Sequence, residues 1–295
     1  MNILFASKPN ADNFARPYTD HMGIPALVTA DPNEVRAAET EVLWLEWANA
    51  WTASVVRTKH KAFTIVRIHD YEIWSGLIQN VDWNNVDLMW FINQQAMADF
   101  NEVIVTDTPQ MFLPNAVSTE GIEVVCEDSK HIAMLSIDVS GRKRYDRAFM
   151  LMRLLPEYQL TIRANTHKGK IMGALTDRIH LDHRPFDASA IHDKSDVNEF
   201  FRGKSHILST SEHEGFHVAV CEGCYAGLAP AVYNWEWGRA RDFWDPNVAD
   251  NLEDLADLIR RAGPSSGWRG WAGAKYSPEA LAPRLMARII CAYPY

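Results

Sequence analysis

Short apolar runs alternate with amphipathic segments along the whole chain, and this alternation is the clearest structural signal in the sequence. The apolar runs predict strands at 2–6, 25–29, 42–46, 63–69, 87–92, 110–113, 131–137, 159–164, 179–182, 206–210 and 229–233. The segments between them predict helices at 33–39, 50–59, 95–100, 145–155, 197–202, 219–226, 251–261 and 278–290. Because strands and helices follow each other in turn, the chain is predicted to form α/β layers.

The alternation is interrupted near residues 115–128. Pro114-Asn115 is a turn signal, and the residues at 118–121 are mostly polar. We therefore expect one α/β unit at 1–122, a second at 123–277, and a C-terminal helix within 278–295 that packs back toward the first unit. Two such units facing each other would leave a cleft, which is a favoured place for a ligand. Residues 263–267 are expected to form a loop before the last helix.

Composition narrows the classes of protein that fit this pattern. The 295 residues are 47% hydrophobic and 23% charged, which is typical of a globular protein with a sizeable core. The net charge of −9 disfavours a general nucleic-acid binder, because such binding relies on cations that neutralise phosphates. We expect no membrane span, since no apolar run is long enough, and the start of the chain does not resemble a secretion signal.

Cysteine usage points to a reducing compartment. The four cysteines are scattered at positions 126, 221, 224 and 291, which fits a cytoplasmic protein. Cys221 and Cys224 have the spacing of a redox pair. We interpret them instead as small residues on a helix, because Glu222 lies between them and no second cysteine pair would complete a zinc site.

The richest candidate chemistry lies between residues 206 and 230. Glu214 and Glu222 are eight positions apart, and they follow the predicted strand at 206–210 and meet the predicted helix at 219–226. The carboxylates therefore belong to a strand–loop–helix joint, which is where an open α/β sheet usually binds its ligand. The free backbone N–H groups at the start of that helix are suited to a phosphate.

The same stretch contains a second pattern. His213-Glu214-Gly215-Phe216-His217 matches the H-E-x-x-H sequence of zinc peptidases. That chemistry needs both histidines on one face of a continuous helix, with the glutamate as the base. Here a glycine interrupts the stretch and a predicted strand directly precedes it. A zinc hydrolase is therefore the less favoured alternative.

Four segments of the chain resemble a known family, the retaining nucleotide-sugar glycosyltransferases of family 4, which have two Rossmann-like domains in the GT-B arrangement. The matching segments are Glu214 to Glu222 with Ser211 before it, Gly141-Arg142-Lys143-Arg144, Leu113-Pro114-Asn115-Ala116-Val117 and Arg67-Ile68-His69-Asp70. The resemblance implies a metal-independent transferase with an acceptor-side domain at 1–122 and a domain that binds the nucleotide sugar at 123–277. No cofactor is implied, because the nucleotide sugar is the substrate.

The resemblance also implies roles for single residues. Glu222 would bind the ribose hydroxyls, and Lys143 would neutralise the diphosphate. Glu214 would contact the donor sugar near the reacting carbon, and we favour an electrostatic stabiliser over a nucleophile. His69 would approach from the other domain and orient the sugar. The further donor-binding residues are Arg142, Arg144, Ser211, Phe216, His217 and Val218.

Departures from the family pattern weaken parts of this assignment. Ile137-Asp138 stands where the family commonly carries Gly-Arg, so Arg142 or Arg144 would have to supply the second cation. His217 replaces a frequent glycine. Ser7-Lys8-Pro9-Asn10 replaces the glycine-rich loop after the first strand, and the first domain is shorter than usual.

The acceptor is not specified by these motifs. Trp47, Trp51 and Trp74 follow predicted strand ends and are the candidates for stacking on an acceptor. A modified base in nucleic acid is the minority hypothesis, and saccharide, lipid-linked or protein acceptors are at least as well supported. A sugar-nucleotide binding module without turnover is the alternative to an enzyme.

Overall fold

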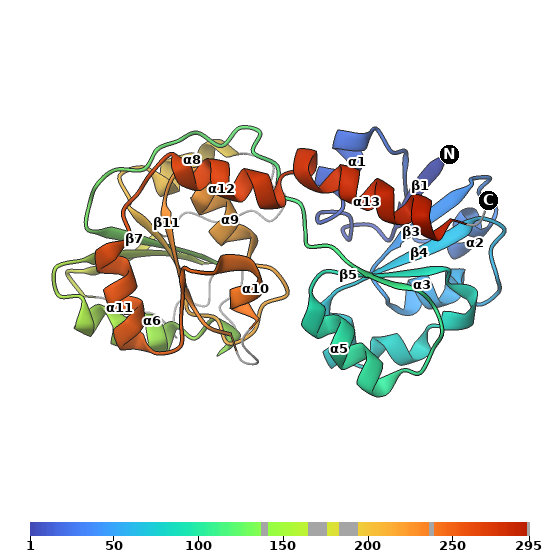
Figure 1. Cartoon of the computed structure of the whole chain (residues 1–295), viewed down its shortest axis with the longest axis horizontal. Helices are drawn as coiled ribbons and strands as arrows, with labels where there is room; N and C mark the ends of the chain where they lie inside the picture. Colours follow the sequence, from blue (N-terminus) through green and yellow to red (C-terminus); the bar gives the residue numbers. More distant parts are fainter. Residues whose placement is uncertain (137–140, 165–175, 183–193, 236–238, 294–295) are drawn as a thin grey trace. The chain divides into compact units, whose positions relative to one another are not determined.

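The computed structural model describes residues 1–136, 141–164, 176–182, 194–235 and 239–293. The chain forms two compact units. Unit 1 consists of Met1–Ser118 with Tyr276–Tyr295, and unit 2 consists of Thr119–Lys275. The chain therefore leaves the first unit once and returns to it at the C-terminus (Figure 1).

Unit 1 is built on a six-stranded parallel sheet with the strand order β2-β1-β3-β4-β5-β6. Its strands are β1 (Ile3–Ser7), β2 (Ala26–Val28), β3 (Val42–Glu46), β4 (Phe63–Ile68), β5 (Leu88–Phe91) and β6 (Gln110–Phe112). Its helices are α1 (Arg16–Met22), α2 (Pro32–Arg36), α3 (Ala50–Val55), α4 (Asp70–Trp74), η1 (Leu77–Asn80), η2 (Trp83–Asn85), α5 (Gln94–Val103) and α13 (Pro278–Ala292). The direction of winding reverses between β1 and β3.

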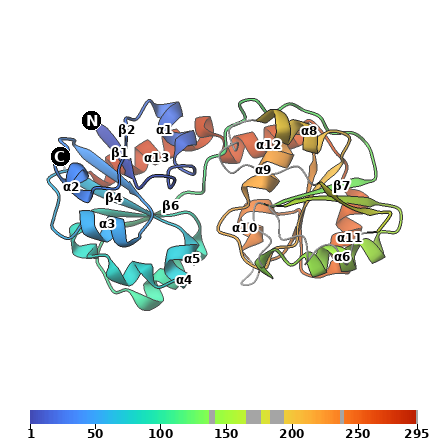
Figure 2. The same ribbon diagram turned by 180° about the vertical axis from the view of Figure 1, so that it is seen from behind.

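Helices cover both faces of this sheet (Figure 2). Helices α1 and α13 pack on one face, where Leu281, Leu285 and Ile289 of α13 join Tyr18 and Trp44 in one buried cluster. The helices α2, α3 and α5 cover the other face. Since α13 buries its apolar stripe in this cluster, the C-terminal helix is part of the core of unit 1.

Unit 2 contains a second six-stranded parallel sheet with the order β12-β11-β10-β7-β8-β9. Its strands are β7 (His131–Ser136), β8 (Gln159–Ala164), β9 (Ile179–Asp182), β10 (His206–Ser209), β11 (Ala229–Tyr233) and β12 (Val248–Ala249). Its helices are η3 (Gly141–Lys143), α6 (Tyr145–Leu154), α8 (Lys194–Phe201), α9 (Val218–Tyr225), α10 (Ala240–Trp244), α11 (Leu252–Arg261) and α12 (Gly267–Tyr276). Counted along the chain, this is the strand order of a Rossmann fold.

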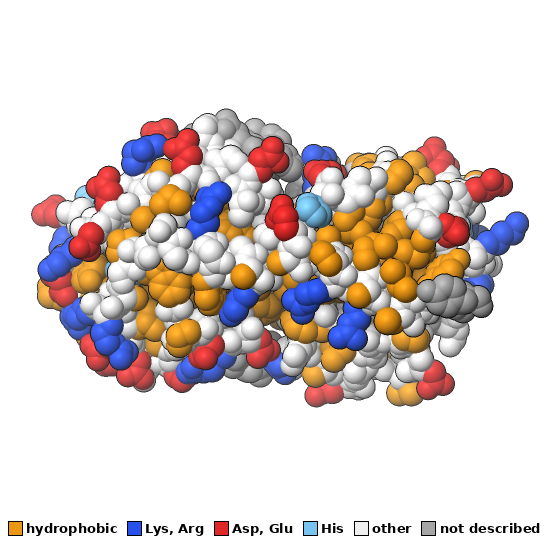
Figure 3. Space-filling view, turned by 45° about the horizontal axis from the view of Figure 1, so that its top comes forward, with side chains coloured by type: hydrophobic (Ala, Val, Ile, Leu, Met, Phe, Trp, Pro, Cys, Tyr) orange, Lys and Arg blue, Asp and Glu red, His pale blue; other side chains and the backbone are white. Residues whose placement is uncertain are grey.

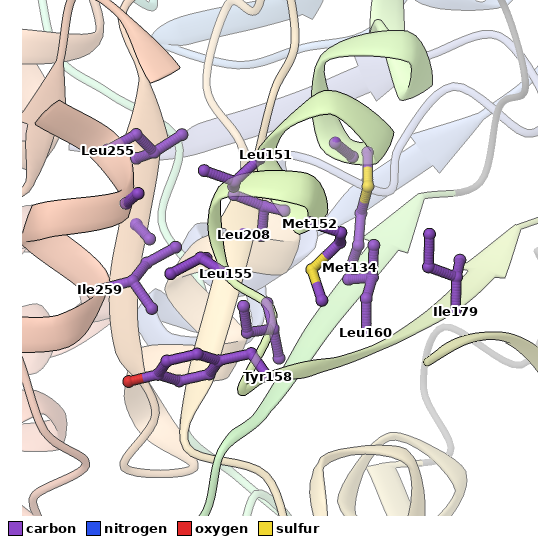
Figure 4. Packing of buried hydrophobic residues seen from close by; sticks show 14 of the residues in the cluster. Met134, Leu151, Met152, Leu155, Tyr158, Leu160, Ile179, Leu208, Leu255 and Ile259 are labelled. Atoms are coloured by element: carbon purple, nitrogen blue, oxygen red, sulfur yellow. The ribbon is translucent and has the colours of Figure 1, made fainter. Parts of the chain in front are cut away.

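The two faces of the second sheet are packed differently. On one face, Leu151 of α6 and Leu255 and Ile259 of α11 meet Met134 and Leu160 of the sheet (Figure 4). On the other face α9 lies close to the strands. A Cβ atom at its Gly223 would lie 2.6 Å from Cβ of Ile207, so this close approach requires glycine.

The predicted α/β class is confirmed, and most strands begin and end within one or two residues of their predicted positions. Of the described α-helices, α1, α4, α10 and α12 were not predicted. Helix α12 starts inside the expected loop at 263–267, and its sequence contains Gly267, Gly270 and Gly273. Glycine disfavours a helix, so packing rather than local preference stabilises this segment. The predicted arrangement of two domains across a cleft stays a prediction.

Two further features concern the length and hydropathy of the helices and the charged side chains on one face. Within the described ranges, no helix is both long and apolar enough to cross a membrane. On the described part of the face drawn in Figure 3, Lys and Arg side chains are interspersed with Asp and Glu.

Candidate functional site

Unit 2 has its topological switch point between β7 and β10. These strands are neighbours in the sheet, and the helices that follow them, α6 and α9, lie on opposite faces (Figure 1). The loops beyond the carboxyl ends of such strands form the usual ligand site of an open α/β sheet. Two hydrogen bonds join these loops, because Thr210 Oγ1 donates to the Lys143 carbonyl at 3.0 Å and Glu212 N donates to the Arg142 carbonyl at 2.8 Å.

An ion pair between Lys143 and Glu214 lies where the loops meet, and both side chains are buried. Ser211 Oγ donates to Glu214 Oε1 at 2.7 Å, and Arg142 lies 3.4 Å from Oε2. Burial raises the pKa of Glu214, but the charges of Lys143, His217 and Arg142 outweigh it and lower the pKa to about 2. The carboxylate is therefore ionised at neutral pH, and two cations face one anion.

The three cations of the 142–144 cluster have different surroundings. Lys143 is buried, whereas the Arg142 side chain is 37% exposed beside Glu214. Arg144 pairs with Glu212 at 3.2 Å and with Asp146 at 2.8 Å. Of the two arginines considered as a second phosphate cation, Arg142 is therefore the one that shares Glu214 with the lysine.

Helix α9 begins directly beside this group. His217 precedes its first residue, and His217 Nδ1 is 2.8 Å from Ser209 Oγ. Burial lowers the pKa of His217 to about 4, with Lys143 and Arg142 contributing and Glu214 opposing, so the ring is neutral at pH 7. Phe216 packs against Phe243 and Trp244, and these contacts hold the loop before α9 in place. At the start of α9, the N–H groups of Val220 and Cys221 donate to the His217 carbonyl at 3.1 and 3.4 Å, so an anion here would be met by the N–H groups of Val218 and Ala219.

Glu222 lies on the same face of α9, one turn after Val218. Its side chain is buried, and Lys194 Nζ is 2.5 Å from Glu222 Oε1. Lys194 is the first residue of α8 and was not identified from the sequence. No local pattern marks it, because it is separated from its partner by 28 positions.

The zinc-peptidase arrangement is not formed. His213 and Glu214 lie in the loop before α9 and His217 lies just before its first residue, so the two histidines do not share a helix face. Among the residues that the structure describes, no three His, Cys, Asp or Glu side chains are grouped to hold a metal ion. Cys221 and Cys224 are buried in α9, and burial raises the pKa of both thiols, which keeps them protonated.

Unit 1 carries a second polar cluster, also at the carboxyl ends of its strands. Glu46, the last residue of β3, is fully buried and lies 3.2 Å from Arg67 Nη1 and 2.8 Å from His69 Nε2. Burial lowers the pKa of His69, although Glu46 opposes this shift. A neutral His69 therefore donates its Nε2–H to Glu46, and its side chain also accepts the backbone N–H of Glu72 in a capping box at the start of α4.

Two of the sequence segments with a family resemblance meet at Arg67. Its guanidinium donates to Asn115 Oδ1 and lies 4.4 Å from the ring centre of Trp90. Tyr18 donates its hydroxyl proton to the Pro114 carbonyl at 2.6 Å. The turn at Pro114-Asn115 is thus held to the same strand end that carries His69.

Of the three candidate tryptophans, Trp47 lies closest to this cluster. Its ring stacks on His69 with centroids 4.0 Å apart, and its Nε1 donates to the Ala11 carbonyl at 2.8 Å. Trp47 has φ of 69°, a left-handed conformation that a bulky residue rarely adopts and that is found most often at functional sites. Trp51 packs in the hydrophobic core of unit 1, and Trp74 is 44% exposed on α4.

Glu72 fixes the backbone around Trp47 and His69. Its carboxyl group accepts the N–H of Ala48 at 2.8 Å and the N–H of His69 at 2.9 Å. Burial raises the pKa of Glu72 to about 8, even though these N–H donors oppose the shift. The sequence offers one sign of such buried acids, since Glu46 ends an otherwise apolar strand. Glu72 carries no comparable sign.

The missing glycine-rich loop after β1 is replaced by another left-handed turn. Asn10 has φ of 65°, and Ala11 N donates to the Lys8 carbonyl at 3.1 Å. Asparagine tolerates this conformation better than most residues, so the turn forms without glycine.

Comparison with known proteins identifies the fold. No family model and no curated protein matches the sequence. HepE from Anabaena, solved with UDP, is 12% identical, with a TM-score of 0.71 over 99% of this chain and 100% of that one. The lipopolysaccharide galactosyltransferase WaaB is 12% identical, with a TM-score of 0.68 over 99% of each chain.

Sucrose-phosphate synthase from Thermosynechococcus elongatus is also 12% identical, with a TM-score of 0.64 over 86% of this chain and 74% of that one. At such identities the similarity concerns the fold alone. The chain has the α/β fold of the GT-B glycosyltransferases, with a Rossmann-like sheet in each unit.

Proposed function

We propose that the chain is a retaining, metal-independent glycosyltransferase that moves a sugar from a nucleotide sugar to a hydroxyl group. One observation carries the proposal. Lys143, Arg142 and Glu214 meet at the switch point of a sheet with Rossmann strand order, beside the start of α9. This combination of cations and a helix start suits a diphosphate.

The donor would lie along α9. Its diphosphate would contact Lys143, Arg142 and the first N–H groups of the helix. Glu222, one turn further along the same face, would accept hydrogen bonds from the ribose hydroxyls. Glu214 and Glu222 are both buried. Both belong to the loop and helix that follow the carboxyl end of β10, which supports their assignment to one ligand.

The chemical step would depend on charge stabilisation. As the bond between the sugar and the diphosphate breaks, negative charge grows on the leaving group, and Lys143 and the helix start would stabilise that charge. Glu214 would act as an electrostatic stabiliser of the positive charge that develops on the sugar. It is already engaged by Lys143 and Ser211, which makes it a weak nucleophile.

Unit 1 would bind uncharged groups. The ring of His69 and the aromatic face of Trp47 beside it would contact a hydroxyl-rich ring. Aromatic faces and neutral hydrogen-bonding groups suit hydroxyl-rich rings, so we assign these residues to the donor sugar and the acceptor.

The proposal is tested by a thermal-shift screen of the full chain in chelator against UDP, GDP, ADP and their sugar conjugates. UDP is the first probe, because HepE has been solved with UDP and with UDP-glucose. A ligand at about 100 times its dissociation constant stabilises the folded state by about 2.7 kcal/mol. We expect one nucleotide class to stabilise the chain, and proton NMR of the product to show a retained anomeric configuration.

Other results would reassign the chain. Tight binding without hydrolysis or transfer of any sugar would make it a sugar-nucleotide binding module. An inverted product would exclude the retaining mechanism. If no nucleotide or sugar nucleotide binds, the proposed function is wrong.

A further inference from the structure

Lys194 forms a contact that the proposed donor site does not yet explain. Its ammonium lies 2.5 Å from Glu222 Oε1, and the two side chains are 15% and 7% exposed. An ion pair so far from water loses much of the hydration of both groups, and such pairs are not a reliable source of stability. A pair of this kind at a proposed ribose site calls for a functional explanation.

The position of Lys194 is fixed by the packing of α8. The fully buried Arg163, on β8, pairs with Asp196 of α8 at 2.9 Å and with Asp182 of β9 at 2.6 Å. Asn198 of α8 donates to the Gly121 carbonyl at 2.7 Å. The start of α8 is therefore tied to the strand ends and to the segment that enters unit 2.

The stem of Lys194 also packs against backbone. Gly121 has φ of +71°, and a Cβ atom at this position would lie 3.1 Å from Cβ of Lys194. A side chain at position 121 would crowd the stem of Lys194, so the glycine leaves room for the lysine to reach Glu222. Held in this way, the side chain loses little additional freedom when a ligand binds.

We propose that Lys194 and Glu222 together form a subsite for a vicinal diol, in which Lys194 determines the preference for ribonucleotides over 2′-deoxyribonucleotides. This inference rests on the proposed function, because it assigns the nucleotide part of the donor to Glu222. It adds a specificity-determining residue that the sequence did not indicate.

Lys194 and Glu222 together match the donor and the acceptor capacity of a hydroxyl group. Each ribose hydroxyl can donate one hydrogen bond and accept others. A carboxylate only accepts and an ammonium only donates, so the pair can satisfy a hydroxyl in both directions. The ammonium has three donors, and Glu222 Oε1 takes one of them.

Lys194 also positions Glu222, because the ion pair holds one oxygen of the carboxylate in place. Removing the lysine therefore removes one donor and leaves the acceptor less well positioned. Both effects act on the bond to the 2′-hydroxyl.

The test compares affinities for UDP and 2′-deoxy-UDP by calorimetry, in the wild-type chain and in Lys194→Met and Lys194→Arg. If the donor screen selects GDP or ADP, that nucleotide and its 2′-deoxy form replace the uridine pair. We expect wild type to prefer the ribonucleotide about tenfold, the size of one hydrogen bond to a charged group. Lys194→Met should reduce the preference to about threefold or less, and Lys194→Arg should keep it.

A matched control is Arg260→Met, which removes the exposed pair with Glu157 in the same unit and should leave the preference unchanged. A lysine with a merely structural role would change both affinities equally. An unchanged preference in Lys194→Met therefore overturns the inference while leaving the proposed function intact. A larger preference would mean that Lys194 competes with the ribose, and would overturn it too. If wild type binds no nucleoside diphosphate, the proposed function fails and the inference fails with it.

Discussion

The two units carry similar sheets but opposite electrostatic environments at their strand ends. In unit 2, Glu214 is surrounded by cations, and its pKa is lowered to about 2. In unit 1, Glu46 divides its contacts between Arg67 and a neutral His69. The neighbouring Glu72 is contacted, among the described residues, by backbone N–H groups, and its pKa is raised to about 8.

On the proposed function, this difference would divide the recognition of a nucleotide sugar. The cations beside Glu214 in unit 2 would suit the anionic diphosphate. The charge-balanced cluster of unit 1, with an aromatic ring and an imidazole, would suit uncharged hydroxyl-rich groups. The two sheets are similar, and buried side chains distinguish their strand ends.

The largest effect is expected from breaking the buried cluster of unit 1. Glu46→Ala leaves Arg67 buried without its carboxylate, and breaking such a pair lowers the free energy of unfolding by about 3–5 kcal/mol. Urea unfolding followed by tryptophan fluorescence measures this change. A loss below about 1 kcal/mol would mean that Asn115 and the Phe14 carbonyl suffice to hold Arg67.

The next effect concerns the cations of unit 2. Lys143→Met should lower kcat by about 10²–10³-fold, because it removes a donor that acts on the charge of the leaving group. Arg144→Met should lower it by less than about tenfold, since Arg144 and both its acid partners are at least partly exposed and such pairs contribute little. Steady-state assays with the donor found in the screen compare the two. Equal losses would contradict the distinction between buried and exposed cations.

Glu222→Ala should mainly weaken nucleotide binding. The loss of the ribose hydrogen bonds to a charged group is expected to raise the dissociation constant about 10- to 100-fold, with a smaller change in kcat. Calorimetry and kinetics on the same preparation separate the two quantities. Wild-type affinity in this variant would remove Glu222 from the donor site.

A separate prediction is a difference in pH dependence between two buried glutamates. Glu72 has a raised pKa, so its contribution to stability is complete below about pH 4.5 and is lost as the pH rises through about 8. Glu214 has a lowered pKa, so its contribution is present above about pH 4.5 and is lost as the pH falls toward 2.

Glu72→Gln and Glu214→Gln test this contrast by urea unfolding across the pH range. The stability of wild type relative to Glu72→Gln should fall between pH 4.5 and 8. Relative to Glu214→Gln it should fall between pH 4.5 and 2. Parallel curves for both variants would show that the two carboxyl groups have similar environments.

Much of the fold could be predicted because its strands are locally distinctive. Val42–Glu46 is a run of apolar and aromatic residues ended by an acid, and β3 has these bounds. Helix α12 could not be predicted in this way, because its three glycines disfavour a helix and packing rather than local preference stabilises it. Glu46 was not singled out from the sequence, and the acid that ends this apolar run gives no sign of its partners.

Those partners depend on register and docking, which the sequence does not display. The parallel register of β3 and β4 places Glu46 opposite Arg67. The pairing of Lys194 with Glu222 depends on how α8 docks on the sheet. Lys143 and Glu214 were predicted for one site through the family resemblance, and the structure places them in an ion pair. Their catalytic roles remain predictions.

The most direct test of the central claim is a calorimetric titration of the best-binding nucleoside diphosphate, in chelator, into wild type and Lys143→Met. If the cations at the switch point of unit 2 hold the diphosphate, wild type binds without metal and the variant binds about 100-fold more weakly, as expected for a lost charge-assisted contact. Equal affinity in both chains, or binding that appears only when a divalent metal is added, would contradict the account.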